Sequence, residues 1–254
     1  MNNVLNRVFA DYLMPSRLSE YERLLVSAKN AGYAQMSVRS FSRGTWAKRV
    51  LVHRHDIDSD LRTARKMFAL ECRHDVRASY YFRLCTLDID FMRDIEASGS
   101  EASYHYEEVA DFAKRRHLHD PIEVRRHFPA IREQFALNVA RITAALGRPL
   151  STVASHGDFA NRKLAIINHE LLADSALRKR CGIECETYDA GLLGQFDIYI
   201  SDRKYPVYYK PMSPFDALGQ YKRICLLTHP VQWETNWVDN TRCNFRRLSE
   251  GIRW

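Results

Sequence analysis

The stretch from Val50 to Asp58 constrains this chain more than any other, because a short apolar, β-branched run ends there in two carboxylates and a histidine. Such a run is typical of a buried strand, and the ligand sites of α/β proteins lie at the carboxyl ends of such strands. Residues two apart on a strand point to the same face, so we expect Asp56 and Asp58 to share a direction while His55 points away.

Two neighbouring carboxylates repel each other unless a cation or a shared proton compensates their charge. A divalent metal ion is the usual compensation, with one carboxylate as its ligand and the other as a base. The alternative is a strand end followed by a helix that Asp58 caps, since Ser59-Asp60-Leu61 begins a helical pattern. Capping leaves the second acid and the histidines unexplained, so the stretch predicts a metal site.

The composition favours an ordinary globular protein in a reducing compartment. With 254 residues, 46% of them hydrophobic, the chain is long enough to bury a sizeable core. It contains neither an apolar run long enough for a transmembrane segment nor the core of a signal peptide. Six cysteines are scattered without a CxxC pair, which is typical of reduced thiols, so we expect a cytoplasmic protein.

The net charge of +7 has two readings, a surface that attracts polyanions or a dispersed, solvated one. The arginines are spread along the chain, which favours a dispersed, solvated surface charge. We also expect an anionic substrate. Aromatic and basic residues interleave only at 205–210, too little to indicate nucleic-acid binding.

Helical and strand-like patterns alternate along the chain. Apolar residues recur at helical spacing in residues 18–31, 61–72, 89–97, 121–146 and 164–180. Strand-like segments occupy residues 50–58, 78–85, 101–106, 151–155, 196–201 and 224–228. This alternation predicts βαβ units and a parallel sheet in an α/β fold. We expect one domain over residues 1–254, with a helical extension at 1–48 packed against it.

Candidate site residues recur where these strands end. Besides Asp56 and Asp58, they are His105, His156, Asp202 and His229. A single histidine is more often a satisfied, partly buried side chain than a ligand. The carboxyl ends of parallel strands converge on one face, however, and that convergence makes the recurrence a sign of one shared site.

On these residues the chain resembles the polysaccharide deacetylase family, the NodB-homology group of metal-dependent carbohydrate esterases. The family's first motif, Thr-Phe-Asp-Asp-Gly, is similar to residues 55–58, and its second, Gly-His-Glu-Ile-Gly-Asn-His-x-x-x-His, to residues 99–109. Its late Leu-x-His strand is similar to residues 226–230. Residues 155–157 fall at its arginine-containing third motif, and residues 200–202 near its fourth. The resemblance implies a distorted (β/α) barrel of about seven parallel strands.

The chain departs from the family's motifs at three places. Adjacent aspartates have become Asp56-Ile57-Asp58, so the motif does not decide which acid is ligand and which is base. The second histidine of the second motif falls on Val109, which cannot bind metal. The third motif lacks its usual arginine and proline. We expect His156 to replace the missing ligand, with Glu107 or Glu108 as the alternative.

The resemblance implies metal-dependent hydrolysis of an N-acyl group on a sugar. A divalent ion, zinc, would be held by Asp58, His105 and His156. Asp56 would act as the base, and His229 would protonate the departing amine. Asp202 would orient His229 and set its tautomer, and Glu107 and Glu108 are further candidates for supporting contacts.

The expected substrate is an acylated sugar of surface polysaccharide biosynthesis, as in O-antigen or capsule, carried on a nucleotide, a lipid or a polymer. Two other functions compete with the deacetylase. One is an inactive, sugar-binding protein on the same fold. The other is a different metal-dependent hydrolase, such as a phosphoesterase, which the many arginines would suit, because fold alone does not decide function.

Overall fold

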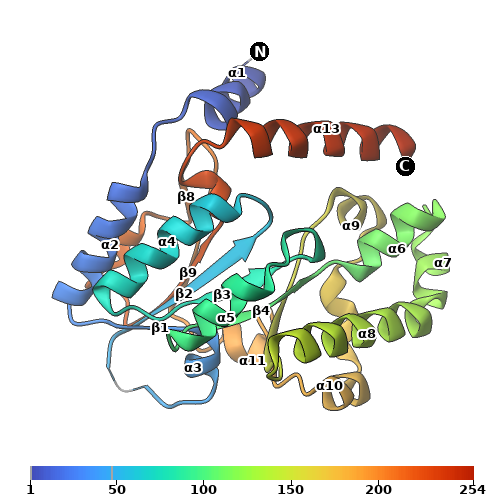
Figure 1. Ribbon diagram of the computed structural model, residues 1–254, viewed down its shortest axis with the longest axis horizontal. Coiled ribbons are helices and arrows are strands. Elements are labelled where there is room, and N and C mark those ends of the chain that lie inside the picture. The colour runs from blue at the N-terminus through green and yellow to red at the C-terminus, as the bar shows by residue number, and fades with distance from the viewer. Residues whose placement is uncertain (1, 47) are drawn as a thin grey trace.

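The computed structural model describes residues 2–46 and 48–254. Residues 1 and 47 of the predicted N-terminal extension lie outside the described part. The strands are β1 (Ala34–Met36), β2 (Val50–Ile57), β3 (Ser79–Phe82), β4 (Glu101–Tyr106), β5 (Thr152–Ser155), β6 (Cys185–Glu186), β7 (Ile198–Asp202), β8 (Tyr209–Lys210) and β9 (Arg223–Thr228). They form one sheet with helices packed around it (Figure 1).

The sheet runs in the order β6-β5-β4-β3-β2-β9-β7-β8, and every neighbouring pair except β7 and β8 is parallel. The additional strand β1 pairs with residues 50–52 of β2, whereas β3 pairs with residues 54–57. The prediction of an α/β fold with a mainly parallel sheet is therefore confirmed. The expected number of about seven parallel strands was too low, because within the described residues the sheet has nine strands and eight of them are parallel to a neighbour.

The sheet is curled, and Arg54 on β2 connects its two flanks. The Arg54 guanidinium donates to the hydroxyl of Tyr188, just after β6, and to that of Tyr199 on β7, each at 3.2 Å. Because β6 and β7 lie on opposite sides of β2 in the strand order, these contacts require the flanks to curve toward each other. The result is a half-barrel whose concave side holds polar side chains.

Thirteen α-helices are present in the described residues. They are α1 (Asn2–Val8), α2 (Leu18–Asn30), α3 (Val38–Ser42), α4 (Leu61–His74), α5 (Ile89–Ala97), α6 (Glu108–Arg116), α7 (Pro121–Arg126), α8 (Phe128–Leu146), α9 (Phe159–Leu164), α10 (Ser175–Cys181), α11 (Ala190–Leu193), α12 (Pro214–Ala217) and α13 (Trp237–Arg253). Short π- or 3₁₀-helical turns follow at η1 (Phe9–Leu13), η2 (Leu84–Thr86), η3 (Asn168–Ala173) and η4 (Pro230–Gln232). No described helix is long and apolar enough to span a bilayer.

Two predicted helices are divided in the structure. The segment 121–146 is interrupted at His127, and α8 starts with Pro129 in its first turn, where a missing N–H does no harm. Inside one continuous helix this proline would remove a hydrogen bond and clash with the preceding turn. The segment 164–180 is divided differently: α9 ends at Leu164, residues 168–173 form a 3₁₀ turn, and the Asp174 carboxylate accepts from two backbone N–H groups and starts α10 as a new helix.

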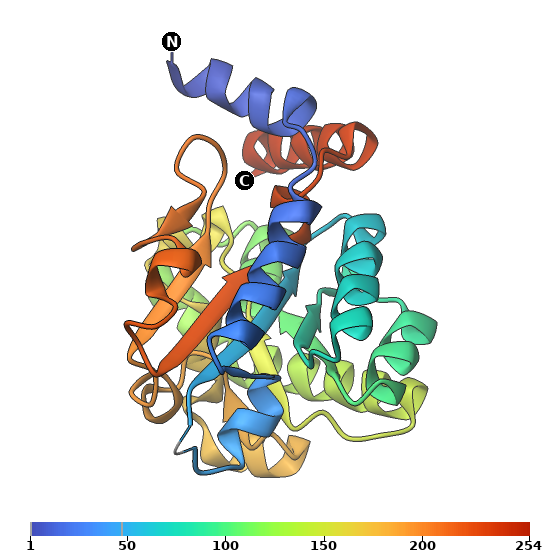
Figure 2. The same ribbon diagram turned by 90° about the vertical axis from the view of Figure 1, so that its left-hand side faces the viewer.

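Strand β2 presents different polar residues on its two faces. His55 contacts the buried Glu71 of α4 at 2.7 Å and Thr228 of β9 at 2.5 Å, on the face that α2 and α4 cover (Figure 2). Arg54 and Asp56 lie on the opposite, concave face, as strand alternation requires. The prediction that His55 points away from Asp56 thus agrees with the structure.

Candidate metal centre and active site

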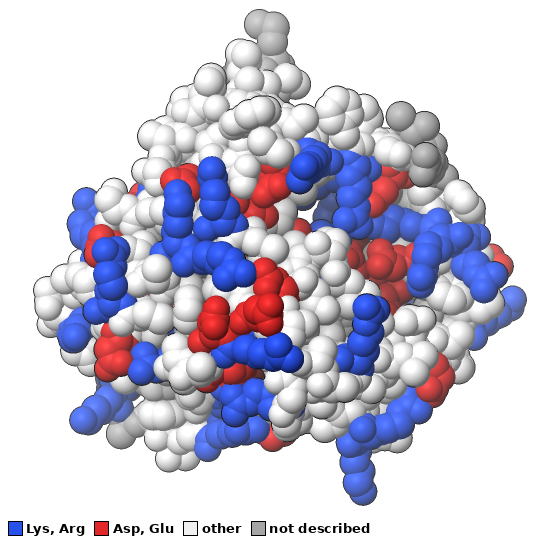
Figure 3. Space-filling view, in the orientation of Figure 1, with Lys and Arg blue, Asp and Glu red and all other residues white. Residues whose placement is uncertain are grey.

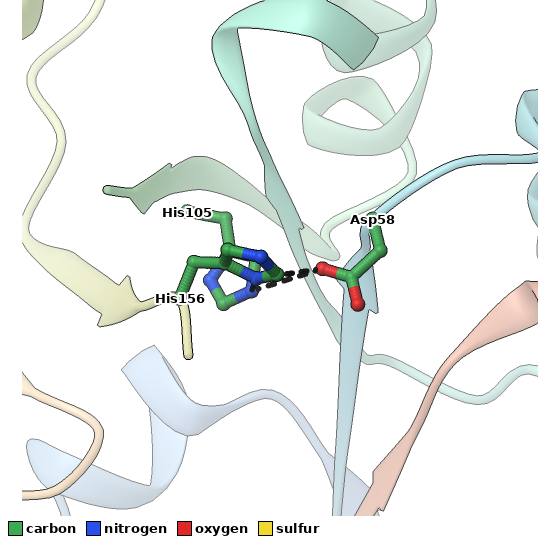
Figure 4. A group of neighbouring side chains, drawn as sticks. All are labelled: Asp58, His105 and His156. Carbon is green, nitrogen blue, oxygen red and sulfur yellow. Dashed lines mark hydrogen bonds and ion pairs between the residues drawn. The ribbon is translucent and has the colours of Figure 1, made fainter. Parts of the chain in front are cut away.

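Three predicted ligands converge at the carboxyl ends of parallel strands. Asp58 follows β2 directly, His105 lies on β4, and His156 follows β5 (Figure 4). The backbone N–H of His156 donates to the carbonyl of Tyr106 at 2.8 Å, which extends β5 along β4 by one residue and brings the two imidazoles together.

The three facing atoms form a nearly equilateral triangle. Asp58 Oδ1 lies 3.0 Å from His156 Nδ1 and 3.3 Å from His105 Nε2, and the two ring nitrogens are 3.2 Å apart. A tetrahedral zinc ion with bonds of about 2.0–2.1 Å separates its ligand atoms by about 3.3 Å. The spacing of this triangle therefore fits a zinc-sized divalent ion.

The hydrogen bonds around the triangle support the same fit. His105 Nδ1 lies 3.0 Å from the carbonyl oxygen of Ala154, which can only accept, so this nitrogen carries the proton and Nε2 offers its lone pair. Asp58 Oδ1 is buried, and its close polar neighbours are the two imidazole nitrogens of the triangle. Burial raises the pKa of Asp58, but His156 and His105 outweigh burial and hold that pKa well below its usual value. An ionised carboxylate oxygen that faces two imidazole nitrogens is a ready metal ligand.

The two alternative ligands are bound to other partners. The Glu107 carboxylate accepts hydrogen bonds from Nε and Nη2 of Arg83, at 2.9 and 2.5 Å, and this ion pair compensates its charge. Glu107 and Asp158 also lie near His156, but Asp158 pairs with Lys114 at 3.0 Å. Glu108 accepts from Tyr104 and Asn138, and burial raises the pKa of Glu108 to about 7.

Val109, where the resemblance would place a second ligand histidine, is fully buried in an apolar cluster of α6, α7, α8 and α9 and neighbouring residues. Its side chain is part of the core. Among the candidates for a third ligand, His156 is the one that faces both Asp58 and His105.

Removal of the His156 imidazole is therefore expected to abolish stoichiometric metal binding. We expect His156→Ala to lower metal affinity by at least about 100-fold, since even supporting residues around a metal change affinity by 10–100-fold. Isothermal titration with Zn²⁺ measures this directly, with Glu107→Gln as the matched control that retains binding. Normal affinity in His156→Ala together with loss in Glu107→Gln would assign the third ligand to Glu107.

Asp56 is buried and held by Arg54. Two of the three guanidinium nitrogens donate to its carboxylate, Nε to Oδ1 at 2.9 Å and Nη2 to Oδ2 at 2.7 Å. Burial raises the pKa of Asp56, but Arg54 outweighs burial and holds that pKa below its usual range. Oδ2 also lies 3.5 Å from His105 Nε2, so an ionised, oriented carboxylate stands beside the metal triangle.

His229 and Asp202 form a second pair at the ends of β9 and β7. The Asp202 carboxylate accepts from His229 Nδ1 and from the His229 backbone N–H, each at 2.7 Å, and from the Trp233 indole at 3.1 Å. Burial lowers the pKa of His229, but Asp202, with Asp58 and Asp56 adding to it, raises that pKa to about 9. His229 is therefore protonated at neutral pH, with Nε2 available to a ligand.

Sequence reasoning missed the partners of Asp56. Arg54 stands two residues before Asp56, so the alternation that paired Asp56 with Asp58 also places Arg54 on the same face. That signal was present in the sequence. Tyr188 and Tyr199, which bind Arg54 from the two flanks of the sheet, have no such signal because only the curl brings them near.

Comparison with known proteins identifies a structural neighbour of this chain. No family model and no curated protein sequence matches this chain. The fold is similar to that of a crystal structure of a mutant CE4 family pseudoenzyme with restored enzymatic activity, with a TM-score of 0.44 and 12% identity. The match covers 81% of this chain and 65% of that one, so this chain spans less than two thirds of its neighbour's length.

Proposed function

We propose that this protein is a metal-dependent carbohydrate N-deacetylase, an amide hydrolase that removes an N-acetyl or related acyl group from a sugar. The observation that carries the proposal is the triangle of Asp58, His105 and His156, with spacings of 3.0, 3.2 and 3.3 Å, next to an ionised carboxylate. Together with the His229–Asp202 pair, it supplies a ligand set, a base and an acid on one face of the sheet.

The two proton transfers of the proposed reaction fall to two different side chains, the ionised Asp56 and the protonated His229. A divalent ion held by Asp58, His105 and His156 would polarise the amide carbonyl and activate water. Asp56, kept ionised by Arg54, accepts the proton of the attacking water. His229, kept protonated by Asp202, donates its Nε2 proton to the departing amine nitrogen. Environments that push two pKa values apart in this way are typical of acid–base pairs in enzymes.

We further propose an acylated sugar of surface polysaccharide biosynthesis as the substrate and a cytoplasmic location. The motifs at residues 55–58, 99–109 and 226–230 support the sugar, through the family that they resemble. All six cysteines are free in the structure, which supports a reducing compartment.

Release of acetate tests the proposed function. Purified protein loaded with Zn²⁺ is incubated with N-acetylated sugars, free, nucleotide-linked and polymeric, and acetate is measured by a coupled assay. The variant His105→Ala is the control for contaminating hydrolases. Acetate release by the wild type alone supports the deacetylase. Sugar binding without acetate release would instead identify the inactive, sugar-binding alternative, and phosphate release from a generic ester would identify a phosphoesterase.

The pH dependence of turnover follows from the His229–Asp202 pair. His229 works as an acid only while protonated, so kcat should fall as pH rises through the pKa of His229. That pKa is raised to about 9 in the metal-free protein, and a bound cation would move it, and the decline in kcat, to lower pH. The Asp202→Asn variant removes the carboxylate charge and should shift the decline in kcat to still lower pH, by about 1–2 pH units. An identical alkaline limb in wild type and Asp202→Asn would exclude His229 as the acid.

A further inference from the structure

Two helical segments from opposite ends of the chain lie together at one end of the molecule. These are α1 with its continuation η1, residues 2–13, and α13, residues 237–253, and both ribbon views place them side by side (Figures 1 and 2). We call the solvent-facing side of this pair the apical surface. Its apolar members are Val4, Leu5, Val8, Leu13, Trp237, Phe245 and Leu248.

The seam between the two segments is polar. The Asn244 amide donates to the Asp11 carboxylate at 3.1 Å and accepts from Arg7 at 2.6 Å. Asn240 donates to the Asp11 backbone carbonyl at 2.6 Å. In most packed helix pairs the apolar side chains meet and the polar ones face water. Here polar side chains make the contacts of the seam, and large apolar side chains of both segments stay exposed.

The apolar side chains point to solvent instead. Exposure lies between 61% and 69% for Val4, Leu5, Leu13, Trp237, Phe245 and Leu248. On α13 the spacing 237, 245, 248 places three of them on one stripe of the helix, and Val4, Leu5 and Val8 similarly share one side of α1. On the face drawn in Figure 3, the end of the molecule where α1 lies is largely free of charged side chains. Exposed large apolar side chains gathered in this way mark a binding face for a protein or a membrane.

Charge distinguishes between these two occupants. Arg242, 78% exposed, follows the apolar stripe around α13, whereas Arg246 is paired with Glu250 at 2.7 Å. The helix as a whole carries four arginines against two acidic residues. The neighbouring β7–β8 loop adds the exposed Arg203 and Val207, and it packs on η1 through Phe9 and Tyr205, whose rings are 4.5 Å apart. An apolar stripe bordered by arginines is typical of helices that lie in the interface of an anionic bilayer. Pairing two copies, each with a net charge of +7, would instead bring like charges together.

We propose that the apical surface binds the surface of an anionic membrane, with the apolar stripe of α13 and the α1 side chains inserted between the headgroups and the arginines contacting acidic lipids. This proposal does not depend on the reaction proposed above.

The same helix is anchored on both sides of the candidate site. At its start Asn236 donates to Asp60 at 2.8 Å, and near its end Glu250 pairs with Lys114, which in turn pairs with Asp158. Asp60 and Asp158 stand two residues after Asp58 and His156. Binding through α13 would therefore bring the candidate site to the bilayer.

Vesicle sedimentation tests the proposal with the full chain. We expect the protein to pellet with vesicles of phosphatidylcholine and phosphatidylglycerol in equal amounts, and far less with phosphatidylcholine alone. The double variant Phe245→Ser, Leu248→Ser should lower the partition coefficient about 100-fold, because it removes two apolar side chains that would become buried in the bilayer. Arg242→Gln should lower it about fivefold, the effect of one basic residue at an anionic surface.

The matched control is Leu137→Ser on α8, where the leucine is 63% exposed but lies outside the apical surface. It should pellet like the wild type. Failure of the wild type to pellet with the anionic vesicles, or equal loss in Leu137→Ser, would overturn the proposal. So would a dimer in analytical ultracentrifugation that the Phe245→Ser, Leu248→Ser variant converts to a monomer without any vesicle binding, because the occupant would then be a second copy.

Discussion

Alanine at Asp58 or at His105 is expected to leave the purified protein without its divalent ion and without deacetylase activity. Each substitution removes one corner of a triangle in which every ligand atom lies 3.0–3.3 Å from the others. Two remaining donors hold an ion much less tightly, and we expect affinity to fall by at least about 100-fold. Mass spectrometry of the metal in purified protein measures occupancy, which should be about one ion per wild-type chain.

His169→Ala is the matched control for this experiment. His169 also contacts carboxylates, Glu186 at 3.3 Å and Asp189 at 3.7 Å, but Asp189 is already paired with both outer nitrogens of Arg178. We expect this variant to keep its ion. Because His105 is buried, thermal denaturation should accompany the assay: added Zn²⁺ should raise the melting temperature of the wild type and not that of His105→Ala. Full occupancy in both Asp58→Ala and His105→Ala would exclude the proposed centre.

Substitution of Asp56 or of His229 by asparagine is expected to reduce kcat by about 10²–10⁴-fold while the ion stays bound. Neither residue is a corner of the triangle, and each is positioned by its own partner, Asp56 by Arg54 and His229 by Asp202. Asparagine keeps the shape of the aspartate and can still accept from Arg54, so the loss would report the missing charge. Metal content measured on the same preparations separates a role in proton transfer from a role in binding.

The two aspartates provide an internal comparison. Asp58→Asn should lose metal, whereas Asp56→Asn should keep it, because Arg54 already occupies both oxygens of Asp56 while Asp58 Oδ1 faces the two imidazoles. The opposite result would exchange the two assignments, making Asp56 the ligand and Asp58 the base.

Much of the candidate site could be predicted because its residues are placed by local rules. A strand end is visible as an apolar run that stops at polar residues, and parallel strands bring their carboxyl ends to one edge. Those two rules are enough to bring Asp58, His105 and His156 together. The breaks in the helices at His127 and Asp174 also had local signals, in Pro129 and in the capping carboxylate, which the apolar periodicity concealed.

The sequence by itself determined the α/β alternation, the strands that carry the site and the direction in which Asp56 and Asp58 point. Only the tertiary structure decided which partner each carboxylate has: Arg54 for Asp56, Arg83 for Glu107, and two imidazoles for Asp58. It also placed α1 beside α13, from opposite ends of the chain. The physical reason is the distance along the sequence between the interacting residues, since strand and helix patterns arise from neighbours a few residues apart. Ion pairs and packed faces depend instead on the curl of the sheet and on contacts between residues far apart in sequence.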